Sequence, residues 1–135
     1  MRSYRESNLW ADFLKLCPQA VRIENSIASG TPDVLFPTET GWRWLELKIQ
    51  YDLFFYMRPF QLSFAIKTMR MENPALVPYY IIYERDSKTA QVFNAGVLVG
   101  LRRFSARQKK VQVQVDFSIP YRSLSEIIVQ LGALG

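Results

Sequence analysis

The sequence predicts a single mixed α/β domain, with a central mixed β-sheet flanked by helices. Three observations carry this prediction. Residues 4 to 16 and 123 to 131 have apolar side chains at helical spacing. Residues 79 to 83 form a run of aromatic and aliphatic side chains that is typical of a buried central strand. Residues 111 to 119 alternate apolar and polar side chains, which indicates a half-buried strand.

The amino-terminal part predicts a helix and a β-hairpin. The helix over residues 4 to 16 ends before Pro18, because proline cannot continue a helix. Thr-Glu-Thr-Gly at residues 38 to 41 predicts the loop of the hairpin. The strands expected in this part are a short one at 21 to 24, the outgoing hairpin strand at 34 to 36 and the returning strand at 42 to 49.

The remaining elements follow from similar signals. Pro59 suits the first turn of a helix that continues over residues 60 to 71, and residues 49 to 57 before it are expected to form a loop. Residues 91 to 94 are expected to pair with the central strand, whereas residues 96 to 101 fit either a helix or a strand. Ser123 and Glu126 have the spacing of a capping box at the start of the last helix.

Composition narrows the possible chemistry. The chain has 135 residues, 49% of them hydrophobic, which is enough for one core. It contains no histidine, which excludes Ser-His-Asp and Cys-His triads and nearly every zinc site. The single Cys17 excludes an internal disulfide and a cysteine-built metal site. Carboxylates are therefore the metal ligands on offer, and oxygen ligands favour Mg²⁺ or Mn²⁺.

Charge and hydropathy bear on partners and location. The formal net charge is +5 and the isoelectric point is near 9.5, which favours a polyanionic partner. No stretch of the sequence approaches the roughly 20 apolar residues of a membrane span, and the first residues lack the pattern of a secretory signal. We therefore expect a soluble, intracellular protein of the cytoplasm without a membrane partner.

The predicted hairpin brings two acids and a lysine together. Glu46 and Lys48 are two residues apart on a strand, so both project from one face while Leu47 points into the core. Asp33 begins the other strand, and the hairpin places that end opposite Lys48. An acid-x-Lys tripeptide also occurs by chance, and Asp86-Ser87-Lys88 in a predicted turn is such a case.

This set of groups suits phosphodiester hydrolysis. Asp33, Glu46 and the backbone carbonyl of Leu47 would hold a metal that polarises the phosphate and activates a water molecule. Lys48 would orient that water or help to deprotonate it, and would offset negative charge on the phosphate. The alternative for Glu46 and Lys48 is a surface charge pair, which is the commoner fate of such residues.

Two further polar residues complete the predicted site. Glu24 would approach the same metal, directly or through water, and Gln61 in the first turn of the next helix would hydrogen-bond the lysine or the water. The ordered set resembles the PD-(D/E)XK nuclease superfamily and is similar to its virus-type replication-repair and Holliday junction resolvase branches. The residues that carry this resemblance are Glu24, Pro32-Asp33, Glu46-x-Lys48 and Gln61.

The resemblance covers roughly residues 4 to 85 and implies a restriction-endonuclease-like core with the element order α-β-β-β-α-β. It implies metal binding by Asp33 and Glu46, catalysis by Lys48, and supporting roles for Glu24 and Gln61. We expect one nuclease domain over residues 1 to 135. Its catalytic core would span about residues 4 to 95, followed by an extension over about residues 96 to 135 whose role is unassigned.

Basic and aromatic residues are the candidates for contact with DNA. A basic run after residue 101 has the chemistry to bind phosphates, although a solvated loop would have the same composition. The aromatic residues between 51 and 56 would either pack in the core or a dimer interface, or stack against unpaired bases. The cationic candidates are Arg58, Lys67, Arg102, Arg103, Arg107, Lys109 and Lys110, and the aromatic ones are Tyr51, Phe54, Phe55 and Tyr56.

The function that these inferences favour is a magnesium-dependent DNA endonuclease acting on branched or structured DNA, with Mn²⁺ able to substitute. A homodimer is expected, because two strands or a four-way junction call for two active sites. Two alternatives stay open. One is a catalytically silent nucleic-acid-binding module of the same fold, and the other is a site-specific homing or restriction-type endonuclease.

Overall fold

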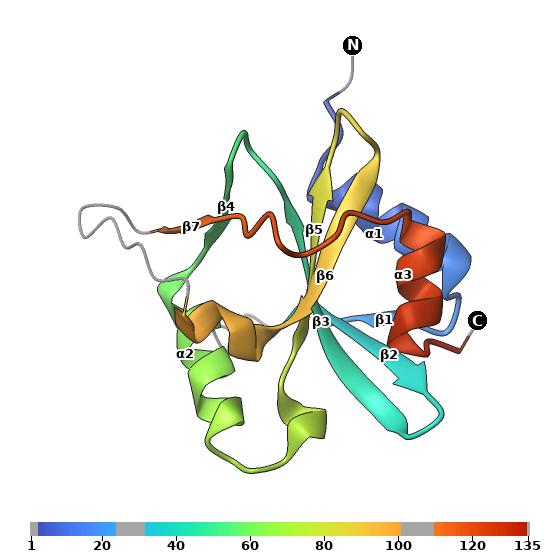
Figure 1. Cartoon of the computed structure of the whole chain (residues 1–135). Helices are drawn as coiled ribbons and strands as arrows, with labels where there is room; N and C mark the ends of the chain where they lie inside the picture. Colours follow the sequence, from blue (N-terminus) through green and yellow to red (C-terminus); the bar gives the residue numbers. More distant parts are fainter. Residues whose placement is uncertain (1–2, 24–31, 101–109, 135) are drawn as a thin grey trace.

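The computed structural model describes residues 3–23, 32–100 and 110–134, and Figure 1 shows how its elements are arranged. A mixed sheet lies at the centre with helices on both sides, which confirms the predicted fold class. The elements in chain order are α1 (Glu6–Leu16), β1 (Val21–Arg22), β2 (Val34–Thr38), β3 (Gly41–Ile49), β4 (Phe54–Met57), α2 (Pro59–Met69), η1 (Pro74–Leu76), β5 (Tyr79–Glu84), β6 (Thr89–Asn94), η2 (Ala95–Gly100), β7 (Val111–Gln114) and α3 (Leu124–Leu131).

The central sheet has five strands in the order β1-β2-β3-β5-β6. Strands β3 and β5 are parallel, and the other neighbouring pairs are antiparallel. A parallel pair needs a long crossover connection, and here β4, α2 and η1 lie between β3 and β5 in the chain. Strands β4 and β7 form a separate two-stranded antiparallel sheet.

The predicted hairpin is confirmed as the unit β2–β3. Thr38 pairs with Gly41, so the loop consists of the two residues between them. The left-handed backbone of Gly41, with φ of 121°, suits glycine because it has no Cβ. The Thr38 hydroxyl donates a hydrogen bond of 2.7 Å to the Gly41 carbonyl, which closes the turn.

Two hydrophobic clusters cover the two faces of the central sheet. One cluster contains Leu45, Leu47 and Ile49 of β3 with side chains of α1 and α3. The other joins β5 and β6 to α2, η2 and the β4–β7 sheet. Figure 1 accordingly shows α1 and α3 on one side of the sheet and α2 with β4 and β7 on the other. The alternation of β3 leaves Glu46 and Lys48 on the α2 side.

The prediction of a loop over residues 49 to 57 is wrong in its second half. Phe54–Met57 forms strand β4, in which Phe55 and Met57 are each 1% exposed. The strand exists because β7 supplies its hydrogen-bonding partner. That partner lies far along the chain, so nothing in the local pattern of residues 49 to 57 revealed it.

The structure corrects one prediction in the carboxyl-terminal part and decides another. The strand expected over residues 111 to 119 ends at Gln114, and Phe117 is 62% exposed instead of facing the core. The chain turns there because the Asp116 carboxylate accepts hydrogen bonds from the backbone and hydroxyl of Ser118. For residues 96 to 101, which fit either a helix or a strand, the structure shows a helix, because Ala95–Gly100 forms the 3-10 helix η2.

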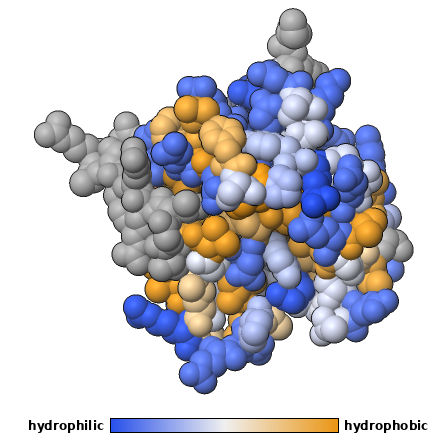
Figure 2. Space-filling model, viewed as in Figure 1, coloured by the Kyte–Doolittle hydropathy of each residue, from blue (hydrophilic) through white to orange (hydrophobic). Residues whose placement is uncertain are grey.

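The surface mixes apolar and polar side chains. On the face drawn in Figure 2, hydrophobic residues reach the surface in several separate patches among hydrophilic ones. Phe60 on α2 and Met71 after it are exposed by 61% and 53%. Within residues 3–23, 32–100 and 110–134, no helix is both long enough and apolar enough to cross a membrane.

Candidate active site

The centre of the candidate site is the pair Glu46 and Lys48 on β3. Both are buried, with 1% and 8% of the residue exposed. Gln61 of α2 joins them, because its carbonyl oxygen accepts a hydrogen bond of 3.0 Å from the Lys48 ammonium. Its amide nitrogen donates to both carboxylate oxygens of Glu46 at 3.3 Å. The hydrogen bond predicted between Gln61 and the lysine is therefore present.

The start of α2 holds Gln61 in place. Pro59 begins the helix, where its fixed φ angle is favourable. Gln61 is the third helical residue, and its side-chain carbonyl also accepts a hydrogen bond of 2.9 Å from the backbone N–H of Arg58. This contact satisfies a donor that the helix itself leaves free. The same side chain thus closes the helix end and bridges Glu46 to Lys48.

Asp33 lies opposite Glu46 at the start of β2. Val34 pairs with Leu45 in the antiparallel hairpin, so Asp33 continues the register toward Glu46. Its carbonyl accepts a hydrogen bond of 2.6 Å from Ile23 N–H, which ties this end of the strand to β1. The hairpin therefore brings Asp33 and Glu46 together as the sequence predicted.

The electrostatics of the site are dominated by burial of acids near one another. Burial raises the pKa of Glu46 to about 8. Lys48 acts in the opposite direction, while the charges of Asp33 and Glu6 raise the pKa further. The pKa of Glu6, a residue that is itself exposed, is also raised, first by loss of hydration and then by Asp33, with Lys48, Arg22 and Arg58 lowering it. The three acids therefore share one electrostatic environment.

Glu6 is a site residue that the sequence reasoning missed. It lies in the first turn of α1 and lines a cavity of about 490 Å³ together with Lys48 and Arg58. The predicted third acid was Glu24, which lies outside the described residues. The position of Glu6 at the start of the amphipathic helix could have made it a candidate. The sequence alone does not show, however, that this end of the helix lies near β3.

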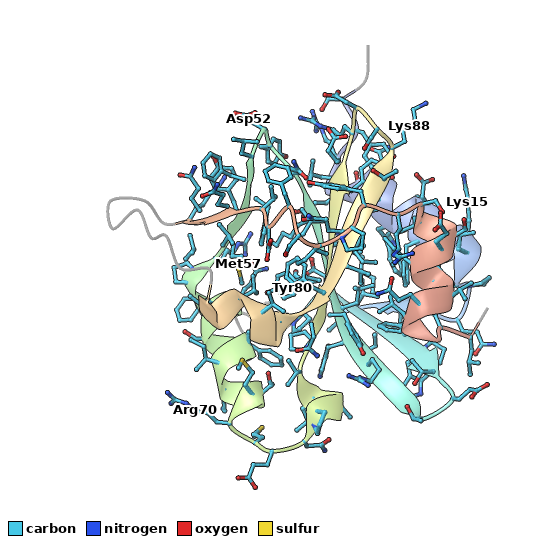
Figure 3. All side chains as sticks on the ribbon, in the orientation of Figure 1. Lys15, Asp52, Met57, Arg70, Tyr80 and Lys88 are labelled. Atoms are coloured by element: carbon cyan, nitrogen blue, oxygen red, sulfur yellow. The ribbon has the colours of Figure 1, made fainter. Side chains whose placement is uncertain are left out.

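Tyr80 is a second neighbour that was not expected. It pairs with Glu46 across the parallel β3–β5 register and is 1% exposed. Burial, followed by the charges of Glu46 and Asp33, raises the pKa of its hydroxyl well above the ordinary value. Its ring stacks on Phe93, with 5.9 Å between centroids. Figure 3 shows Tyr80 and Met57 in the space between the central sheet and β4.

The donor set fits a hard divalent cation. In the part of the chain that the structure describes, no three His, Cys, Asp or Glu side chains group closely enough to hold a metal ion alone. Asp33 and Glu46 with a backbone carbonyl give an oxygen-only set, which suits Mg²⁺ or Mn²⁺. Within the described part of the chain, the ion pairs are Lys15–Asp12 and Arg122–Glu126, and neither includes Glu46. A buried carboxylate beside another acid is stabilised by a cation.

The predicted DNA-contacting residues are found in different places. Arg58 and Lys110 line the cavity next to Lys48. Lys67 lies on the outer side of α2, where it lines a second cavity with Arg70 and Met71. Four others fall outside the described residues, namely Arg102, Arg103, Arg107 and Lys109.

Comparisons with known proteins identify the fold. No family model and no curated protein matches the sequence. Among solved structures, the chain is similar to Hjc, a Holliday junction resolvase from the archaeal hyperthermophile Archaeoglobus fulgidus. The TM-score is 0.55 at 16% sequence identity, and the match covers 90% of this chain and 97% of that chain. The match therefore extends beyond residues 4 to 85.

At 16% identity this match shows that the two chains share a fold, which confirms the fold class that the sequence predicts. The roles expected for Glu24, Asp33, Glu46, Lys48 and Gln61 from the resemblance stay predictions. In this fold the motif residues of the present chain lie on the central hairpin and at the start of the helix that follows it.

Proposed function

We propose that this protein is a divalent-metal-dependent nuclease that hydrolyses phosphodiester bonds in branched or otherwise structured DNA. The observation that carries the proposal is the buried Glu46–Gln61–Lys48 arrangement, with Asp33 opposite, on the fold of a Holliday junction resolvase. A surface charge pair would be solvated, whereas Glu46 and Lys48 are 1% and 8% exposed. Burying such groups costs free energy, and perturbed buried acids concentrate at functional sites.

Each side chain has a distinct task in this proposal. Asp33, Glu46 and the Leu47 carbonyl would hold the cation. A bound Mg²⁺ or Mn²⁺ supplies Lewis acidity toward the phosphate and lowers the pKa of a coordinated water. Lys48 presents its ammonium where negative charge develops on the phosphate, a preorganised contribution. Gln61 fixes the positions of Lys48 and Glu46, because it accepts from one and donates to the other.

We propose for Glu6 a supporting role of the kind that the sequence predicts for Glu24, whose own role stays a prediction. Its carboxylate is coupled to Lys48 and Asp33 and lines the same cavity. We propose that it contacts the cation, directly or through water. A substitution of Glu6 by glutamine is then expected to weaken metal binding more than it changes the stability of the fold.

Three cationic side chains around the cavity favour DNA as the substrate. Lys48, Arg58 and Lys110 outnumber the single carboxylate of Glu6 in the cavity lining, and such a surface attracts the phosphate backbone. The structural neighbour is named as a resolvase of Holliday junctions. We therefore propose branched DNA as the substrate class.

A homodimer is part of the same proposal. Cutting a four-way junction on two strands requires two active sites, and a two-fold dimer supplies them symmetrically. Helix α2 and the chain just after it expose three large apolar side chains, namely Phe60, Met69 and Met71. A second copy of the protein can cover this surface. Light scattering of the purified chain tests this, with an expected mass of twice 15.8 kDa.

The test of the proposed function is a cleavage assay on labelled four-way, flapped, nicked and duplex DNA. Each substrate is incubated with Mg²⁺, with Mn²⁺ or with EDTA. Native protein is expected to cut branched DNA only when a cation is present. Asp33→Ala is expected to bind the DNA but not cut it. Asp86→Ala, which removes the acid of the surface tripeptide Asp86-Ser87-Lys88, is the matched control and should cut normally.

Two outcomes would replace the proposal with an alternative. If native protein binds branched DNA but cuts no substrate with either cation, the protein is a binding module of the same fold. If it cuts duplex DNA at one sequence and ignores branches, it is a site-specific endonuclease.

A further inference from the structure

The cavity beside Lys48 has an aromatic wall that the proposed chemistry does not use. Tyr51 and Tyr56 line it together with Lys48, Arg58 and Lys110. Tyr51 is 47% exposed, and Tyr56 is half-buried. Hydrolysis needs the acids and the lysine but no aromatic ring. Two tyrosines around a cationic cavity therefore suggest a second binding task.

The structure separates these tyrosines from the neighbouring phenylalanines. Phe55 is 1% exposed and packs against Phe93, with 6.1 Å between ring centroids. It belongs to the core and cannot contact a ligand. Phe54 does not line the cavity. Of the four aromatic residues that the sequence singled out, only Tyr51 and Tyr56 face this space.

The turn that carries Tyr51 is held by several hydrogen bonds. It begins a tight turn in which Tyr51 and Phe54 exchange backbone hydrogen bonds of 2.7 and 3.0 Å. The buried Gln50 side chain donates to the Asp52 carbonyl at the tip of this turn, which Figure 3 labels. Tyr121 in turn donates to Gln50 at 2.7 Å. A turn held in this way loses little conformational freedom when a ligand binds.

The cations around the two rings occupy different sides. Arg85 lies 5.2 Å from the centre of the Tyr51 ring but does not line the cavity, so it supports the ring from outside. Lys110 lies 5.9 Å from the centre of the Tyr56 ring and does line the cavity. The two rings are already in contact, with 6.0 Å between centroids, which leaves no room for a base between them. A base would therefore stack on a ring face that borders the cavity.

Stacking of a base on the Tyr56 ring is expected to outweigh the contact of that ring with Lys110. An exposed cation–π contact is generally weaker than the stacking of a base on an aromatic ring. The displaced Lys110 ammonium is then free to meet a backbone phosphate, as is Arg58. The cavity of about 490 Å³ lies within the range of roughly 300–1,000 Å³ found for small-ligand sites.

We propose that the Tyr51–Tyr56 wall is a stacking subsite for an unpaired base next to the phosphate that is cut. This inference rests on the proposed nuclease function, because Lys48 belongs to both the active site and the cavity. Bases within a continuous duplex are stacked on one another and cannot enter the cavity. The preferred substrate is therefore DNA with an unpaired nucleotide at the point of cutting, such as a fork, a flap or the centre of a junction.

The test measures binding without cutting, so that it does not depend on catalysis. Forked DNA is labelled and titrated in EDTA by fluorescence anisotropy. In a matched set of forks, an abasic site replaces one of the unpaired nucleotides nearest the branch, each position in turn. Native protein is expected to bind one or more of these abasic forks about 5-fold to 150-fold more weakly than the intact fork.

Variants show whether the lost base had contacted the two rings. The double variant Tyr51→Leu, Tyr56→Leu is expected to bind intact and abasic forks equally. Tyr51→Phe, Tyr56→Phe keeps the rings and should restore the difference. Trp42→Ala is the matched control, because Trp42 is a 53% exposed aromatic residue that does not line this cavity. It should behave as native protein does.

The outcomes separate this inference from the nuclease proposal. Native protein that binds every abasic fork as tightly as the intact one overturns the stacking subsite, even if the same preparation cuts the intact fork with Mg²⁺. Native protein that binds no fork in EDTA overturns the stacking subsite, while the cleavage assay with Mg²⁺ or Mn²⁺ decides the nuclease proposal separately. An abasic effect without cleavage in that assay keeps a base-stacking site but overturns the nuclease, and with it the placement of that site next to a cut phosphate. The comparison of native protein on two DNAs stands even if a tyrosine variant fails to fold.

Discussion

The proposed active site and the cavity wall beside it are built in two different ways. The acids, the lysine and Gln61 come from the hairpin and the helix that follows it, and their side chains are buried and joined by hydrogen bonds. The wall consists of Tyr51 in the turn before β4, Tyr56 in β4 and Lys110 just before β7, and the pairing of β4 with the distant β7 brings these residues together. The proposed chemistry thus rests on a local unit, whereas the proposed recognition surface depends on a long-range pairing.

The largest expected effect tests whether β4 is a packed strand or a recognition loop. Phe55→Ala should lower the free energy of unfolding by about 3–5 kcal/mol, because it removes a fully buried aromatic side chain. Phe54→Ala removes a half-buried side chain that alternates to the other face of β4, and should cost less than about 1.5 kcal/mol. Urea denaturation of both variants measures the difference. Equal losses would mean that β4 does not pack as the structure shows.

The same contrast explains what the sequence could and could not predict. Asp33, Glu46, Lys48 and Gln61 lie within one hairpin and one helix start, where alternation and turn chemistry are enough to place them. Strand β4 and the contact of Glu6 with the site depend on partners distant in the chain. No local pattern encodes such a contact, because it is decided by how whole elements pack.

Phe117 shows where alternation of apolar and polar residues fails to predict a strand. The pattern from Val111 onward continues through Phe117, yet the strand stops at Gln114. Hydrogen bonds from Ser118 to the Asp116 carboxylate form a local turn that competes with the strand. The side chain that the pattern placed inside is exposed as a result.

The second expected effect concerns the buried acid. Glu46→Gln should lower the rate of metal-dependent cleavage by about 10²–10³-fold, because it replaces the proposed charged metal ligand with a neutral one. The glutamine keeps the shape of the side chain, so the fold should survive. Single-turnover cleavage of a four-way junction in Mg²⁺ measures the rate. A variant that cuts at the native rate would remove Glu46 from the mechanism.

The third effect is the positioning role of Gln61. Gln61→Ala should slow cleavage about 10-fold to 100-fold, the usual cost of losing a group that orients a ligand. It should also destabilise α2 by about 1 kcal/mol, since the contact with Arg58 N–H is lost. Ser63→Ala, on the same helix, is the control. If Gln61→Ala loses stability but keeps its turnover rate, the residue is only a helix cap.

The fourth expected effect is a pH dependence of the metal-free protein. Folding raises the pKa of Glu46 from its ordinary value of 4.5 to about 8. Between these values the folded state holds a proton that the unfolded chain has released. Stability should therefore fall as pH rises through this window, by at most about 1.4 kcal/mol per pH unit, and level off above it.

Glu46→Gln isolates that contribution. Denaturation in EDTA should show a shallower slope of stability against pH for the variant than for native protein. It should also show a more stable variant at pH 8, because no buried carboxyl has to lose its proton. Parallel curves for the two proteins would show that Glu46 titrates normally in the fold.

The most direct measurement of the central claim compares two lysines that stand in the same tripeptide pattern. Lys48 is buried beside two acids, whereas Lys88 is exposed in a turn. In single-turnover cleavage of a four-way junction with Mg²⁺, Lys48→Ala should be slower than native protein by at least about 100-fold, with junction binding retained. Lys88→Ala should cut at the native rate. Native-rate cleavage by a folded Lys48→Ala protein would contradict the assignment of this site as the active centre.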